Sequence, residues 1–418
     1  MLGSYAEVLR QPGAIATSGS ALIGRLPIAM EGLGTVLLIT ARGGSYALAG
    51  SISAAFVLAG SFAGPSVARL VDRRGQSHIV PLLTIGHVIG LITFVLLVEF
   101  RWPAWLFALA AAAAGTMQPN FGVLIRARWS YLLSGTPALR TAYALESLLD
   151  EVVFVVGPPA TTLLSVSVAA PSPLLLSIGF VVLGTIGLLA QRGTEPVPVT
   201  ETRRDDGQVL LARGMPVLVV VFLLLGALFG SFEVVAVAFA QEHGNRAYAG
   251  PLLAMWSLGS LIGGLSFGAR KYPTPLPKVF LIALGVLTVA SAPFVFAPNV
   301  PVAAVMFMVA GVAVSPSLIA GFSLVEGIAP EGRLNEALSW ATTGLGIGVA
   351  LAATLAGAII DAHGAHVAFL VGSAATALAL LTALSGRSEI AAAYRPTDPA
   401  AANDTDPGAL PEASEGRD

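Results

Sequence analysis

Two stretches of the chain run without a charged side chain for longer than a water-facing fold allows. Residues 279–325 and 152–191 contain no Asp, Glu, Lys or Arg over 47 and 40 positions. A helix that crosses the hydrocarbon core of a bilayer needs about 20 residues, so each stretch holds most of two such helices. Turn residues divide both stretches, Ala170 to Pro173 in the shorter one and Pro298 to Pro301 in the longer one. We therefore expect a chain that is solvated by lipid.

The composition excludes several classes of protein. Charged residues make up 11% of the 418 positions, against about 25% in soluble domains. The mean hydropathy is +0.81 and the formal net charge is -2. These values exclude a soluble globular enzyme, a disordered protein and a basic nucleic-acid binder. There are no cysteines, which excludes disulfides and cysteine zinc sites.

The same reading along the whole chain predicts an all-α membrane protein with twelve transmembrane helices. Strands are excluded because the apolar runs do not alternate and because open strands leave backbone groups unpaired in lipid. The predicted spans are 15–40, 46–68, 79–98, 104–126, 142–167, 173–191, 215–240, 250–270, 277–297, 302–325, 336–360 and 365–385.

The distribution of Lys and Arg predicts the orientation. With a cytoplasmic N-terminus, 18 of the 22 basic residues fall in inside segments and three in outside loops. This bias predicts that both termini are cytoplasmic, in a multi-pass protein of the plasma (inner) membrane. We expect a six-helix bundle at 1–191, a cytoplasmic central loop at 192–213, a second bundle at 214–385 and a disordered tail at 386–418.

The two predicted bundles are weakly similar in sequence at an offset of about 200 residues. Ala47, Ala49 and Gly50 align with Ala247, Ala249 and Gly250, and each set opens an even-numbered span. Six spans in each bundle make the two repeats parallel. Parallel repeats around a central site are an arrangement of secondary transporters.

The loop between spans two and three carries a motif. It contains Asp72, Arg73 and Gly75, and with them the chain resembles the major facilitator superfamily, whose loop reads Gly-x-x-x-Asp-Arg/Lys-x-Gly. Ala68 stands where that family usually has Gly. The resemblance covers about residues 10–385 and implies two parallel six-helix repeats and a small-molecule substrate. It also implies a conformational switch at Asp72, Arg73 and Gly75.

A second, shorter similarity lies in span five. Gly157 and Pro158 resemble the Gly-Pro core of the family's antiporter signature, which implies export. The alternative is a structural kink, because Pro removes a backbone donor and bends a helix. The middle of span four, Leu109 to Gln118, lacks the Arg expected of a drug/proton antiporter.

Charges within the spans are the main functional candidates, because each costs on the order of 3 kcal/mol at the bilayer centre. Span one contains Arg25 and Glu31, which are six residues apart and do not form a direct i,i+4 pair on the helix. Glu31 is a candidate proton site, and Arg25 either binds an anionic substrate or pairs with an acid elsewhere. Glu233 in span seven lies at a similar depth to Glu31 and is a candidate for substrate or proton binding. The alternative for Arg25 and Glu31 is a structural ion pair.

Span five contains three acids, Glu146, Asp150 and Glu151, and Glu146 is expected nearest the membrane interface. We expect a charge network that joins them to Arg126 and Arg128 at the end of span four. The network is either a structural gate or a proton relay. Further polar and aromatic candidates for substrate contact are Gln118, Asn120, Phe121, Ser315, Ser317, Trp256 and Trp340.

The sequence shows no P-loop and no His-Glu-x-x-His motif, and His363 and His366 lack further ligands. We therefore expect a protein that is not an enzyme, without metal or cofactor, that acts as a monomer in the bilayer and binds no nucleic acid. The main hypothesis is proton-coupled export of a drug-like, metabolite or sugar molecule by alternating access. The alternatives are nutrient uptake by a symporter or uniporter, and a non-transporting membrane sensor.

Overall fold

A computed structural model describes residues 8–11, 13–133, 136, 138–198, 209–268, 274–329 and 334–394. Over these residues the chain is helical and contains no strand. The longer helices are α2 (Ala14–Ala41), α3 (Tyr46–Arg74), α4 (Gln76–Glu99), α5 (Ala104–Thr116), α6 (Phe121–Leu132), α7 (Ala138–Ser167), α8 (Ser172–Ala190), α9 (Met215–Glu242), α10 (Ala249–Gly268), α11 (Leu276–Ser291), α12 (Val300–Ile328), α13 (Leu334–His363) and α14 (Ala365–Ser385).

The prediction of twelve spans is confirmed. Twelve helical segments in the described part of the chain are long and apolar enough to cross a membrane. The fourth of these, Ala104–Leu132, differs from the continuous helix that we expected. It is broken between α5 and α6, where Pro119 lacks the backbone N–H that a continuous helix would need.

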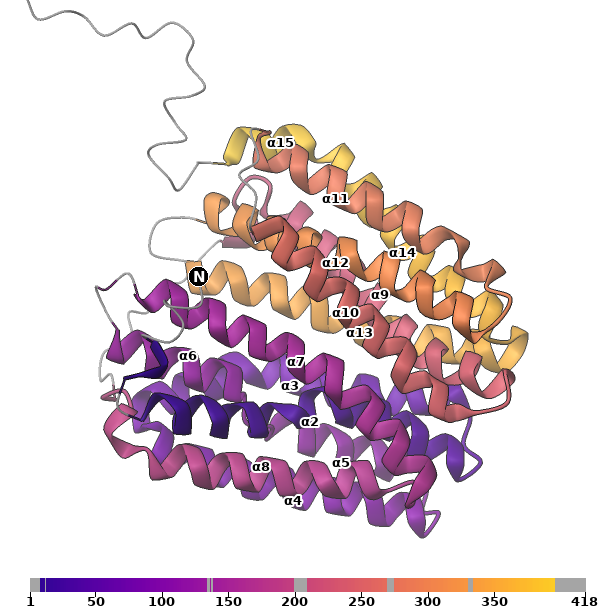
Figure 1. The fold of residues 1–418 in the computed structure, drawn as a ribbon, viewed down its shortest axis with the longest axis horizontal. Helices are drawn as coiled ribbons and strands as arrows, with labels where there is room; N and C mark the ends of the chain where they lie inside the picture. The colour runs from indigo at the N-terminus through magenta and orange to yellow at the C-terminus, as the bar shows by residue number, and fades with distance from the viewer. Residues whose placement is uncertain are drawn as a thin grey trace, which may run out of the picture.

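The helices form two six-span halves, α2–α8 and α9–α14, which occupy the lower and upper parts of Figure 1. Many large apolar side chains are exposed around the bundle, as expected for a lipid-facing surface. The second half has an aromatic core around Phe232, whose ring lies 4.8 to 5.6 Å from those of Trp256, Phe294, Phe307 and Phe369.

The two halves meet where α3 packs against α13 and α7 packs against α10. Glycines permit the close approach. A Cβ placed on Gly50 of α3 would collide with the backbone carbonyl of Ala353 on α13 and lie 3.1 Å from the Cα of Thr354. A Cβ on Gly250 of α10 would lie 2.5 Å from the carbonyl oxygen of Pro158 on α7. Both contacts join one half to the other.

One end of the bundle is closed by hydrogen bonds between the halves. We call it the Asp361 end; it includes the connections at 42–45, 243–245 and 364. The Asp361 carboxylate, at the end of α13, accepts hydrogen bonds from the backbone N–H groups of Tyr46 and Ala47 at 2.9 and 2.7 Å. The Tyr46 hydroxyl contacts Gln241 Oε1 of α9 at 2.8 Å. The charge bias predicts that this end faces outward.

Helix α3 shows why these bonds form. The first four N–H groups of a helix have no partner within it. The N-cap residue Ser45 satisfies two of them, those of Leu48 through its side chain and Ala49 through its carbonyl. The remaining two, Tyr46 and Ala47, are satisfied by Asp361 from the other half. The first turn of α3 is therefore complete only while the Asp361 end is closed.

The segment expected to be disordered after 386 begins with structure. Residues Arg387–Ala393 form helix α15, with Ile390 2% exposed against the second half. The prediction was wrong for this part because the high Pro and Asp content that suggested disorder starts only after Tyr394. The predicted tail after Tyr394 lies outside the described residues, as does the middle of the predicted central loop, residues 199–208. The domain boundaries stay a prediction.

Gly75 of the loop motif separates α3 from α4 with φ 85° and ψ 152°, a conformation that residues with a Cβ rarely adopt. We expect Gly75→Ala to destabilise the protein by about 1–3 kcal/mol, the cost of a residue held in such a region. Thermal unfolding in detergent measures it. Gly179→Ala on α8, where a Cβ would meet nothing within 4 Å, is the control. An equal melting temperature for the two variants would contradict the prediction.

Candidate functional site

Arg25 on α2 is paired with acids of α7 rather than with Glu31. Its guanidinium donates to Glu146 and, at 2.8 Å, to Asp150 Oδ1. Asp150 Oδ2 accepts in turn from Arg126 Nη2 of α6, also at 2.8 Å. Two cations and two anions from three helices thus form one balanced network. Of the two interpretations of Arg25, these contacts favour pairing with an acid over binding an anionic substrate.

The Glu146 side chain is fully buried. Its place near the membrane interface stays a prediction. Besides Arg25, it accepts hydrogen bonds from Ser18 Oγ at 2.7 Å and from Trp129 Nε1 at 2.8 Å. A carboxylate with a cation and two neutral donors has its lone pairs satisfied, which makes such burial possible. Glu146 is therefore a structural centre that joins α2, α6 and α7.

The expectation that Arg128 joins the acids of span five was wrong. It points to the opposite side of α6, two residues from Arg126 and thus about 200° around the helix. Its side chain is fully buried and donates to Gln76 Oε1 at 2.7 Å, to the Gln191 carbonyl at 2.8 Å and to Thr194 Oγ1 at 2.6 Å. Arg128 thus ties the end of span four to the start of α4 and to the end of α8.

Glu31 lies at the centre of a second buried cluster. Its Oε1 is 3.0 Å from His87 Nε2 on α4, and its Oε2 accepts from Gln118 Nε2 at 2.7 Å. His87 Nδ1 is 2.9 Å from the carbonyl oxygen of Ala114. The exposed fractions of Glu31 and His87 are 2% and 0%. We call Glu31, His87 and Gln118 the Glu31 cluster.

His87 is a functional candidate that the sequence prediction did not include. A histidine at the middle of an otherwise apolar span is costly to bury without a partner, and this cost was the available signal. The prediction rested on Asp, Glu, Lys and Arg alone as charges within spans. His87 is 56 positions from Glu31 in the sequence, so only the packing of α2 against the helices of the same half brings the two together.

The fourth span is interrupted near the Glu31 cluster, and two groups beside the break, the Gln118 side chain and the Ala114 carbonyl, contact the cluster. Helix α5 ends at Thr116, and Gln118, in the break, points to Glu31. Asn120 caps α6 and accepts from the Val123 N–H at 3.1 Å. The Ala114 carbonyl in the last turn of α5 binds His87. Interrupted helices that expose backbone groups at membrane depth line binding sites in many transporters.

Two further acids lie at the interface between the halves. Glu151 on α7 accepts from Ser315 Oγ on α12 at 3.3 Å, and Ser315 is 2.7 Å from Ser260 Oγ on α10. Glu233 on α9 lies against α2, since a Cβ on Gly32 would lie 3.2 Å from the Glu233 carboxyl carbon. Gly32 follows Glu31 directly in the sequence. This contact supports the expected proximity of Glu31 and Glu233, which stays a prediction.

The other candidates have more ordinary surroundings. Ser317 donates to the carbonyl of Ala313 on its own helix, and Trp256 is 7% exposed in the aromatic core. Trp340 is 38% exposed, and the Phe121 ring packs at 2.6 Å from a Cβ placed on Gly24. Among the described residues no group of His and acidic side chains is arranged to hold a metal ion.

The motif residues are placed as follows. Asp72 and Arg73 lie exposed in the last turns of α3, beyond the apolar part of that helix. Partial burial raises the pKa of the Asp72 carboxyl above its usual range. Helix α7 runs unbroken through Gly157 and Pro158, and a Cβ on Gly157 would lie 2.6 Å from Ala29 Cβ. The kink at these residues stays a prediction.

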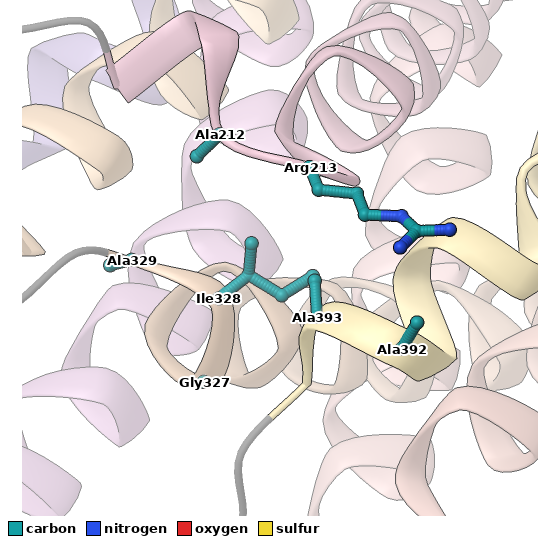
Figure 2. Close-up of a pocket in the computed structure, with 7 residues that line it drawn as sticks. All are labelled: Ala212, Arg213, Gly327, Ile328, Ala329, Ala392 and Ala393. Atoms are coloured by element: carbon teal, nitrogen blue, oxygen red, sulfur yellow. The ribbon is translucent and has the colours of Figure 1, made fainter.

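A pocket of about 370 Å³ lies elsewhere, between the ends of α12 and α15 and the start of α9. Figure 2 shows its lining, in which the Arg213 side chain extends beside α15 and Ile328 is the one large apolar side chain. None of the candidate residues lines it. It contributes one cation and no acid, so we do not assign it to the site.

Comparisons with known proteins agree with the fold. The sequence model of the Major Facilitator Superfamily matches residues 274–413. A comparison with curated proteins finds no match. The solved structure of a nucleoside transporter, NupG, is similar with a TM-score of 0.72 at 14% identity, over 89% of this chain and 98% of that one.

Two other solved structures are similar over comparable lengths. A bacterial homologue of the iron transporter ferroportin, in an inward-facing state, has a TM-score of 0.67 at 15% identity, over 89% of this chain and 98% of that one. The E. coli fucose:proton symporter FucP has a TM-score of 0.59 at 15% identity, over 91% of this chain and 99% of that one.

Proposed function

The chain has the fold of the major facilitator superfamily and matches that family's sequence model over residues 274–413, and from these two findings we propose a secondary active transporter. It moves a small molecule across the membrane by alternating access, with protons as the coupling ion and export as the direction. Uptake is the second candidate, because a fucose:proton symporter is among the similar structures.

The observation that carries proton coupling is the position of three carboxylates in the middle of spans at or beside the interface between the halves. Glu233 of α9 packs against Gly32 of α2, the residue after Glu31, and Glu151 reaches from α7 to Ser315 on α12. A carboxylate buried in lipid is costly while charged, so each gains from taking up a proton. Rocking of the halves would change the exposure of all three.

The closed Asp361 end supports alternating access. Its hydrogen bonds join the two halves at this end, and they must break for it to open. With the orientation that the charge bias predicts, this state is closed outward, and its inner end is the one that admits substrate. The bacterial homologue of ferroportin, whose fold is similar, was solved in an inward-facing state.

We expect the variants Glu31→Gln and Glu233→Gln to lose transport driven by a pH gradient, because neither amide can take up a proton. Purified protein in liposomes is screened with sugars, nucleosides, amino acids and drug-like amines, and the compound with the largest flux is used. Asp150→Asn is the third variant, since Asp150 already serves two arginines. Unchanged gradient-driven flux in these three variants and in Glu151→Gln would exclude proton coupling through these carboxylates.

The direction is tested with the same preparation. In right-side-out vesicles, counterflow is measured first with equal pH on both sides, so that no proton gradient drives transport. An inward-directed proton gradient is then imposed. Efflux stimulated by that gradient supports export, and uptake stimulated by it supports a symporter.

A further inference from the structure

The Glu31 cluster differs from the other acids because its hydrogen bonds fix how many protons it holds. The carbonyl oxygen of Ala114 can only accept, so His87 Nδ1 carries a hydrogen. The contact of 3.0 Å between His87 Nε2 and Glu31 Oε1 then requires one further proton between them. That proton sits either on the imidazole, which gives an ion pair, or on the carboxyl, which gives a neutral pair.

Without that proton the contact is repulsive. The lone pair of Nε2 would face a carboxylate oxygen, and the buried pair would carry an uncompensated negative charge. Gln118 donates to the other oxygen, Oε2, and cannot supply a hydrogen to Nε2 from there. The hydrogen bond between Glu31 of α2 and His87 of α4 therefore forms only while the pair holds this proton.

From this geometry we infer that Glu31 and His87 together form the binding site of the coupling proton, and that loss of the proton separates Glu31 from His87. This inference rests on the proposed function and makes it specific. The freed Glu31 side chain lies next to Gly32, against which Glu233 of the other half packs. Release of the proton thus leaves an uncompensated negative charge on α2, one residue from the contact with Glu233, and this charge favours movement of the halves.

The other charged groups near the pair are already accounted for. On α9, Glu233 packs against Gly32 beside Glu31. Helix α7 contains Glu146, Asp150 and Glu151, of which the first two are paired with arginines. Helix α6 contains Arg126, paired with Asp150, and Arg128, which donates to Gln76, Gln191 and Thr194. Helices α5 and α8 contain no ionisable side chain. Helix α3 faces His87 with Phe56, whose ring is 6.4 Å from the imidazole, and its charges lie at its far end.

The first experiment measures the proton directly and needs no substrate. The chain has five histidines, so the ¹⁵N spectrum of histidine-labelled protein in nanodiscs is simple, and His87→Asn assigns the His87 signals. We expect Nδ1 to be protonated throughout and Nε2 to share a proton at neutral pH. In Glu31→Gln the Nε2 signal should move to that of a bare nitrogen. A His87 spectrum that Glu31→Gln leaves unchanged would overturn the inference.

The second experiment measures coupling in liposomes. His87→Asn should lose the stimulation of transport by a pH gradient. His78→Asn, an exposed histidine on the same helix, is the matched control and should keep that stimulation. If wild type shows no gradient-driven transport, the proposed function fails. If wild type shows it and His87→Asn retains it with the same proton-to-substrate ratio, the inference alone fails.

Discussion

Replacing Glu146 by alanine should lower the free energy of unfolding by about 3–5 kcal/mol, the cost of removing one partner from a buried ion pair. The substitution leaves the buried Arg25 guanidinium with Asp150 as its remaining acid. It also removes the acceptor of Ser18 Oγ and of Trp129 Nε1, each a buried donor. Thermal and denaturant unfolding in detergent measure the loss.

A matched control exists on the same half. Glu99 forms an ion pair with Arg42 at 2.7 Å, but the two side chains are 27% and 37% exposed. Partly exposed pairs are worth about 0.2–1 kcal/mol, so Glu99→Ala should have a small effect. If Glu146→Ala destabilises no more than Glu99→Ala, the network around Arg25 is not a structural centre.

Replacing Gly50 by leucine should open the Asp361 end. The nearest atoms to a side chain there belong to the backbone of Ala353 and Thr354 on α13, which cannot rotate away. The two halves must therefore separate, and overpacking of this kind costs about 1–3 kcal/mol of the closed state. Transport should fall, because one of the two alternating states becomes costly to reach.

Distances between spin labels measure this opening. The chain has no native cysteine, so Trp102→Cys and His363→Cys, both exposed at the Asp361 end, can be labelled without other changes. Gly64→Leu is the control, since a Cβ at that position on the same helix would meet nothing within 4 Å. An unchanged distance distribution in Gly50→Leu would show that the α3–α13 contact does not set the state.

The fold could be predicted almost completely, because lipid imposes simple rules on a sequence. Absence of charge over about 20 residues marks a span, and the bounds of eleven of the twelve spans follow from it. The break at Gln118 to Asn120 was missed although Pro119 signals it, because the apolar character of span four continues on both sides.

The candidate site was predicted in its residues but not in its pairings. Membrane depth selects Arg25, Glu31 and Glu233 because a charge there needs a reason. Depth does not tell which helix faces which, so the assignment of Arg128 to the acids failed and the partnership of Glu31 with His87 was not seen. Pairing depends on how α2, α4 and α7 rotate about their axes, which hydropathy does not record.

The hydrogen bonds from Asp361 to the start of α3 also have a thermodynamic consequence for the cycle. Helix caps contribute about 1 kcal/mol, with a range of about 0.5–2 kcal/mol. One or two kcal/mol changes a population ratio by a factor of about 5–30. When the halves part, Tyr46 and Ala47 lose their acceptor unless water replaces it. The resting ensemble is thus biased by a single carboxylate, and ions or solutes that compete for it from the adjacent aqueous phase become modulators of turnover.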